Sequence, residues 1–170
     1  FGVVPGPSVI DLVEVIRDVK GLEFVGLAAH RGAISINKVE DTSAESREKI
    51  QRVLDARLLV EKTGMDVKMV SVGGTDDYEI AASIDGVTEV SAGSYVLMDQ
   101  RLRHRCAQFH PAAKVMASVT SLPEFGVAIT DGGQKAISSD TGLPALENLP
   151  GVQVKSLSAE HGNFILNSSS

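Results

Sequence analysis

The feature that most constrains the fold is a set of three short apolar runs, each followed by a glycine-containing turn. The runs are residues 22–29, 67–72 and 87–90, and the turns are His30-Arg31-Gly32, Gly73-Gly74-Thr75 and Gly93-Ser94-Tyr95. Short runs rich in β-formers are typical of buried strands. Segments with helical spacing of apolar residues precede the runs, at residues 7–20, 43–63 and 78–82. This alternation predicts an α/β fold with parallel strands and right-handed crossovers.

Such a pattern fits two architectures, a doubly wound sheet or part of an eight-stranded (β/α)8 barrel. In both, the chemistry lies at the carboxyl ends of the strands. The three turns should therefore lie side by side and carry any active site.

After residue 110 the alternation of helices and strands ends. Strand-like stretches at residues 115–121, 126–130 and 152–157 are separated by turn-rich segments without long helices. The sequence predicts a second, mostly β, domain. We expect the domains to be residues 1–108 and 109–170.

Charge and composition exclude several classes of partner. The net charge is -6, from 16 basic against 22 acidic residues. This charge argues against a surface that binds the phosphate backbone of nucleic acids. No apolar run approaches the roughly 20 residues that span a bilayer. Cys106 is the sole cysteine, so an internal disulfide is impossible. We expect a cytoplasmic protein that binds neither nucleic acid nor membrane.

The second and third turns have the chemistry of an anion site. Glycines let backbone N–H groups approach a dianion, and the Thr75 and Ser94 hydroxyls can donate further hydrogen bonds. The Gly-Lys-Ser/Thr and Gly-x-Gly-x-x-Gly patterns of nucleotide sites are absent. Spacing alone leaves an equal alternative, in which both are ordinary strand-to-helix turns with a hydroxyl cap.

The histidines are weaker candidates. His30, at the first strand end, could contact a ring or act as an acid–base group, but a purely structural histidine is as consistent with the pattern. His104 and His110 flank Cys106 without the spacing of a metal site, and His161 stands alone. We expect no metal ligands within these 170 residues.

Longer motifs around these turns resemble the D-threonine aldolases and the related D-serine dehydratases. The matching stretches, in the family's order, are Val70–Thr75, Glu89–Asp99, Asp131–Pro144 and Leu157–Gly162. The resemblance covers residues 2 to 166, and the Lys-Ala-x-Ser-x-Asp-x-Gly-x-Pro stretch is more similar to the aldolase branch.

The resemblance implies an alanine-racemase-like pyridoxal-phosphate enzyme, with the C-terminal part of a (β/α)8 barrel followed by a mostly β domain. The three strands would be the sixth to eighth of the barrel. Thr75 would bind the cofactor phosphate with backbone donors from Gly93 and Ser94, while Tyr95 packs beside them and His30 faces the cofactor. The cofactor-binding set implied is His30, Gly74, Thr75, Gly93, Ser94 and Tyr95.

Other parts of the family's site have no match here. The Schiff-base lysine is expected upstream of Phe1, and the metal ligands beyond Ser170. A histidine-x-aspartate pair there would favour the aldolase and histidine-x-cysteine the dehydratase. Where the racemases place an arginine at the pyridine nitrogen, this chain has Ser91, a weak partner for a charged pyridinium.

The function that this resemblance implies is cleavage of small D-β-hydroxy amino acids to glycine and an aldehyde, assisted by Mn²⁺ or Zn²⁺. One alternative is a D-serine-dehydratase-like deaminase. Another is a non-catalytic pyridoxal-phosphate-binding protein. A homodimer is the expected assembly, because active sites of this fold are often shared across a dimer.

Overall fold

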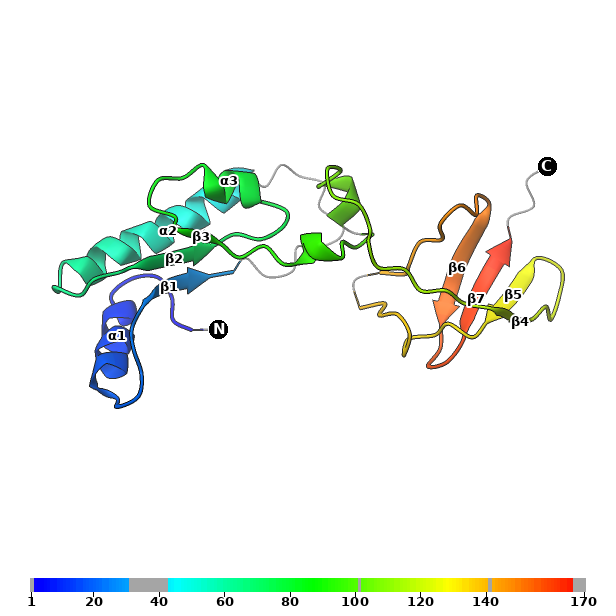
Figure 1. The fold of residues 1–170 in the computed structure, drawn as a ribbon, viewed down its shortest axis with the longest axis horizontal. Helices are drawn as coiled ribbons and strands as arrows, with labels where there is room; N and C mark the ends of the chain where they lie inside the picture. The colour runs from blue at the N-terminus through cyan, green and yellow to red at the C-terminus, as the bar shows by residue number, and fades with distance from the viewer. Residues whose placement is uncertain (1, 31–42, 101, 141, 167–170) are drawn as a thin grey trace. The chain divides into compact units, whose positions relative to one another are not determined.

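The chain divides into two compact units, residues 1–95 and 96–170. The computed structural model describes residues 2–30, 43–100, 102–140 and 142–166 (Figure 1). The domain boundary predicted at residue 108 stays a prediction.

The first unit contains a parallel sheet in the order β1-β2-β3. The strands are β1 (Gly26–Ala29), β2 (Met69–Val72) and β3 (Glu89–Val90). All three fall within the predicted apolar runs. β1 is shorter than its run, although the Val25 carbonyl already accepts hydrogen bonds from the Lys68 and Met69 N–H groups.

Three helices accompany this sheet: α1 (Ser8–Asp18), α2 (Ser43–Glu61) and α3 (Tyr78–Ala82). Their boundaries follow local signals. Gly64, at φ 86°, ends the turn after α2, because its N–H bonds the Glu61 carbonyl. The sequence offers Thr42 or Ser43 as the N-terminal cap of α2, and Thr42 lies outside the described residues.

The core of this unit packs helix faces against one side of the sheet. Its buried side chains come from α1, α2, β2, α3 and the residue two positions before β2: Val9, Val13, Ile50, Val53, Leu54, Ala56, Val60, Val67, Val70, Val72 and Ala81. The apolar spacing in α2 predicts a buried stripe of Ile50, Val53, Leu54 and Leu58, but Leu58 is 55% exposed and Ala56 and Val60 are buried instead. The true stripe follows positions 50, 53, 54 and then 56 and 60, so the side that faces the core turns away from position 58.

Strand β2 presents different chemistry on its two faces. Val70 and Val72 are fully buried in the core. Ser71, between them, points to the opposite face because side chains alternate along a strand. That opposite face carries the polar groups described below.

The second unit contains an antiparallel sheet in the order β4-β5-β7-β6. The strands are β4 (Val119–Ser121), β5 (Val127–Thr130), β6 (Val152–Leu157) and β7 (Gly162–Leu166), after two short 3-10 helices, η1 (Ser94–Val96) and η2 (Leu102–His104). Sequence reasoning missed β7, which is paired on both sides. It opens with Gly162 and Asn163, two residues depleted in strands.

Around η2, Leu102 and Cys106 are buried with Met98, while Arg103, His104 and Arg105 face solvent. The sequence predicts a solvated basic face for residues 101–105, and the exposure of these three side chains agrees with that prediction. Among the described helices, each is too short or too polar to cross a membrane.

Candidate functional site

The parallel register brings the carboxyl ends of β1, β2 and β3 to one edge of the sheet. His30 follows β1 directly, and its Cε1 lies 3.5 Å from the position that a Cβ on Gly74 would occupy. The turns after β2 and β3 also touch, because the Tyr95 N–H donates a 3.0 Å hydrogen bond to Thr75 Oγ1. The predicted residues from all three strand ends therefore converge.

The Gly73-Gly74-Thr75 turn is buried and tightly packed. Gly73 has φ 79°, in the left-handed region where a side chain is strained. A Cβ there would lie only 2.8 Å from the Ala81 Cβ. Gly73 thus lets the chain reverse against α3. Thr75 is 5% exposed, so its hydroxyl is placed by the surrounding structure.

A buried carboxylate holds this turn in place. The Gly74 N–H donates to Asp77 Oδ1 at 2.7 Å, and Ser46 Oγ, from the first turn of α2, donates to Asp77 Oδ2 at 2.9 Å. Asp77 is 5% exposed. The N–H of Gly74 is therefore already engaged by the protein.

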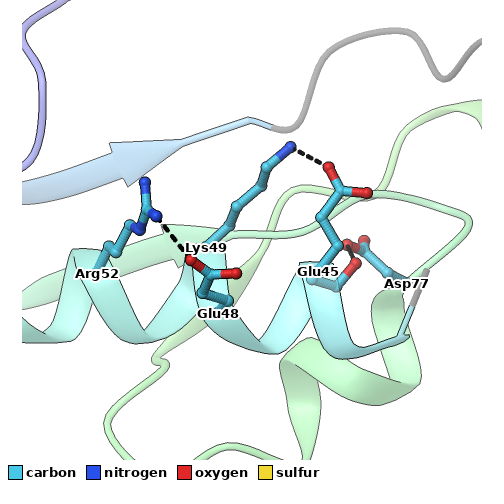
Figure 2. Close-up of polar contacts among 6 residues, drawn as sticks. Glu45, Glu48, Lys49, Arg52 and Asp77 are labelled. Carbon is cyan, nitrogen blue, oxygen red and sulfur yellow. Dashed lines mark hydrogen bonds and ion pairs between the residues drawn. The ribbon is translucent and has the colours of Figure 1, made fainter.

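Figure 2 shows Asp77 beside the start of α2, together with the ion pairs on that helix. Lys49 pairs with Glu45 at 2.7 Å and Arg52 with Glu48 at 2.6 Å, each four residues apart. Exposed pairs of this kind each stabilise a helix by only about 0.2–0.5 kcal/mol. The Asp77 contact is different because it is buried and joins distant parts of the chain.

The Gly93-Ser94-Tyr95 turn is open. No atom lies within 4 Å of a Cβ built on Gly93, and all three residues are exposed. In the part of the chain that the structure describes, the N–H groups of Gly93 and Ser94 make no hydrogen bond. Two adjacent backbone donors at a strand end are what an anion requires.

A second polar group, which sequence reasoning did not single out, lies on the sheet face opposite the core. Ser71 Oγ donates to Glu89 Oε1 at 2.5 Å and lies 2.6 Å from Ser91 Oγ. The signal in the sequence is the two-residue spacing of Glu89 and Ser91, which puts both on one face of the strand. Ser71 joins them through the register that pairs it with Glu89.

In the second unit, the Asp131–Pro144 and Leu157–Gly162 motifs are packed together. The Gln134 N–H donates to the Ser158 carbonyl at 2.8 Å, and the Lys135 N–H donates to the Ala159 carbonyl at 3.0 Å. The Lys135 ammonium pairs with Glu160. His161 is exposed at this turn. These motifs form one local structure within the unit.

Among the described residues, no group of three or more histidine, cysteine, aspartate or glutamate side chains is arranged to hold a metal ion. The positions expected for the lysine and the metal ligands fall outside this sequence. Those expectations stay predictions.

Three comparisons with known proteins bear on identity. The family described as "Putative serine dehydratase domain" matches residues 112–170. D-threonine aldolase from Arthrobacter sp is 29% identical over 95% of this chain and 44% of its own length. D-threo-3-hydroxyaspartate dehydratase from Delftia sp. (strain HT23) is 32% identical over 72% of this chain and 33% of its own.

A solved structure agrees with these relatives. The crystal structure of D-threonine aldolase from Filomicrobium marinum matches with a TM-score of 0.75 and 27% identity, over 98% of this chain and 46% of that one. The predicted fold, the C-terminal part of a barrel followed by a mostly β domain, is confirmed. The fold class is thus that of the alanine-racemase-like proteins.

Within that class, the chain is similar to the D-threonine aldolases and the related dehydratases, and residues 112–170 match the serine dehydratase family. It spans 44% of the length of the D-threonine aldolase from Arthrobacter sp and of the 3-hydroxy-D-aspartate aldolase from Paracoccus denitrificans (strain Pd 1222).

Proposed function

We propose that the full-length protein is a pyridoxal-phosphate-dependent lyase, which cleaves small D-β-hydroxy amino acids to glycine and an aldehyde. The observation that carries this proposal is the meeting of three strand ends at an open pair of backbone donors. Similarity to an aldolase along 95% of the chain supports the reaction class.

The open turn fits a phosphate monoester. The N–H groups of Gly93 and Ser94 point to no acceptor in the described part of the chain, and Gly93 leaves room for close approach. The Thr75 hydroxyl lies beside them through its contact with Tyr95. The negative charge of Asp77 is directed at its own donors, Gly74 and Ser46, and so is partly compensated.

Each residue then has a distinct role. Gly93 and Ser94 bind the phosphate, and Thr75 holds the two turns together and adds a hydroxyl. His30, exposed beside Gly74, borders the space in front of the strand ends. Gly74 contributes room for the cofactor but no hydrogen-bond donor, because its N–H already bonds Asp77.

Bound pyridoxal phosphate would supply the electron sink for breaking the carbon–carbon bond. A lysine and a divalent metal, Mn²⁺ or Zn²⁺, are implied by the family and belong to the parts of the protein outside this sequence. A D-amino acid substrate, a homodimer and a cytoplasmic location are parts of the same proposal.

The test uses the full-length protein with pyridoxal phosphate. We expect a visible absorption band of bound cofactor and, with D-threonine and Mn²⁺, formation of glycine and acetaldehyde. L-threonine is the matched control and should give no glycine. A full-length protein that shows no cofactor band contradicts the proposal.

A second candidate is the dehydratase reaction, favoured by the match of residues 112–170 to the serine dehydratase family and by the similarity to a hydroxyaspartate dehydratase. Release of ammonia and a keto acid from D-serine or D-threo-3-hydroxyaspartate, with no glycine from D-threonine, would select it. Cofactor binding without turnover of any of these would indicate a binding protein.

A further inference from the structure

The charges at the three strand ends are unevenly distributed. The open donors, the N–H groups of Gly93 and Ser94, lie at the end of β3. An imidazole and a carboxylate stand on the side of β1 and β2. His30 Cε1 and Asp76 Oδ1 each lie 3.5 Å from the position that a Cβ on Gly74 would occupy. These two side chains therefore approach the same point beside the buried turn.

A dianion bound to the open donors would add to the negative charge of this edge. Two carboxylates are already present in the turn after β2. Asp77 accepts hydrogen bonds from Gly74 and Ser46, so its charge is partly compensated. Asp76 brings a second carboxylate to the His30 side of the turn. Because like charges repel, a positive charge close to both Asp76 and the dianion would stabilise the bound state.

His30 is the group that can supply this charge. Among the described residues of the three strand ends, namely 30, 73–77 and 91–95, it is the one whose side chain can become cationic. Imidazole changes its charge between pH 5 and 8. The titratable groups that approach the same point are the two carboxylates of the turn, Asp76 and Asp77. His30 is exposed and can therefore exchange protons with solvent.

Other cations near this edge differ from His30 in one respect. Lys49, near the start of α2, is paired with Glu45 at 2.7 Å (Figure 2). Arg47 lies in the first turns of α2, and Arg31 lies outside the described residues. Arginine stays charged throughout the range in which imidazole titrates, so it adds a constant attraction. A pH-dependent affinity for a dianion would thus be specific to His30.

The expected size of the effect follows from the strand spacing. Neighbouring strands lie about 4.8 Å apart, so a ring beside the end of β2 is roughly 7 Å from an anion at the end of β3. At that distance in water, a unit positive charge should strengthen the binding of a dianion roughly 5- to 10-fold at low ionic strength.

We propose that His30 supplies the countercharge of the anion site, so that a dianion bound at Gly93 and Ser94 is accompanied by protonation of His30. This rests on the proposed function, which makes that turn the phosphate site. Because proton and anion binding are linked, each favours the other. The affinity for a dianion should therefore fall as the pH rises and the imidazole loses its charge.

The experiment uses sulfate as the probe. Sulfate stays a dianion throughout the titration of imidazole, whereas a phosphate monoester changes its own charge at about pH 6. The full-length protein without cofactor is titrated with sodium sulfate at constant low ionic strength, and the amide resonances of Gly93 and Ser94 are followed by NMR. We expect both to shift, with a dissociation constant roughly 5- to 10-fold higher at about pH 8.5 than at about pH 5.5.

Two variants identify the titrating group. His30→Gln keeps a polar side chain and removes the titration, so its affinity for sulfate should be that of the wild type at high pH and should not change with pH. His104→Gln is the matched control, because His104 is an exposed histidine of η2 in the second unit. It should show the pH dependence of the wild type.

A second measurement needs no substitution. The Cε1–H resonance of His30 reports the charge of the ring in the wild-type protein. At a pH where the ring is half protonated without ligand, saturating sulfate should move this resonance toward its protonated position. A resonance that stays where it was would overturn the proposal.

This inference and the lyase proposal fail in different ways. Sulfate binding that is independent of pH, or a pH dependence that persists in His30→Gln, would overturn the role of His30 and leave the lyase proposal standing. Amide resonances of Gly93 and Ser94 that respond to sulfate at no pH would also overturn it. The absorption band of bound cofactor then decides the lyase proposal by itself.

Discussion

At the end of β2 the Gly73-Gly74-Thr75 turn is buried and its Gly74 N–H is bonded to Asp77, whereas at the end of β3 the Gly93-Ser94-Tyr95 turn is exposed and leaves two N–H groups open. In sequence both are glycine-and-hydroxyl turns after an apolar run. The first turn is held by a carboxylate and a close approach to α3. The second turn is linked to the first by the hydrogen bond from the Tyr95 N–H to Thr75. The difference teaches that a strand-end glycine can serve packing or binding, and that its neighbours decide which.

The largest expected effect separates the two glycines. Gly73→Ala should destabilise the protein by about 2–5 kcal/mol, the sum of a left-handed backbone penalty and overpacking against Ala81. Gly93→Ala should change stability by less than about 0.5 kcal/mol, because nothing lies within 4 Å of the new methyl group. Urea unfolding of the full-length protein measures both. Equal losses at the two positions would contradict the comparison.

The next effect tests the open donors. Ser94→Pro removes the backbone N–H at the first position of η1, where proline is tolerated. A hydrogen bond to a charged group contributes about 1.5–3 kcal/mol, so affinity for pyridoxal phosphate should fall by roughly 10- to 100-fold. Titration of the full-length apoprotein, followed by absorbance, measures it. Ser94→Ala keeps the N–H and should lose less. If Ser94→Pro binds as well as the wild type, this N–H does not hold the phosphate.

A smaller effect concerns the bond between the turns. Thr75→Val removes the acceptor for the Tyr95 N–H and should cost about 1 kcal/mol in urea unfolding. Thr75→Ser retains a hydroxyl and should recover most of that loss. Full stability in the valine variant would mean that the two turns are held together by other contacts.

The smallest expected effect concerns an exposed ion pair, which serves as a reference for the buried contacts. Arg17 donates to Asp18 at 2.8 Å, and this hydrogen bond, with the opposite charge, lowers the pKa of the Asp18 carboxyl and raises the pKa of Arg17. The pKa of Asp18 is lower in the folded state than in the unfolded state. The ion pair therefore contributes to the free energy of unfolding at pH values above the unfolded pKa, and this contribution disappears as the pH falls through the folded pKa.

Carboxyl NMR titration should therefore show the Asp18 pKa rising to its ordinary value in Arg17→Gln. The urea midpoint near neutral pH should stay the same, because exposed ion pairs contribute little. A marked change in the midpoint would show that surface pairs matter here as much as the buried turn does.

Much of the first unit was predictable because it depends on local signals. Apolar runs ending at glycine marked the strands, and helical spacing marked α1, α2 and α3. Strand β7 was not predictable in this way, because Gly162 and Asn163 are in a strand only through pairing with β5 and β6.

The site was predicted in part for the same reason. The sequence indicated which strand ends would meet, and His30, Gly74, Thr75 and Tyr95 do lie together. It could not show that Asp77 also accepts a hydrogen bond from Ser46, because these residues are 31 positions apart. The Ser71–Glu89–Ser91 chain likewise depends on the register between two strands.

The carboxylate of Asp77 also makes the Gly74 amide a reporter on a distant helix. The carboxylate that accepts this N–H through Oδ1 also accepts the Ser46 hydroxyl, from the first turn of α2, through Oδ2. The rate at which this single amide exchanges its hydrogen with solvent should therefore follow the opening and closing of α2. A change that loosens the first turn of α2 would then be detected at the edge of the proposed cofactor site, without any ligand present.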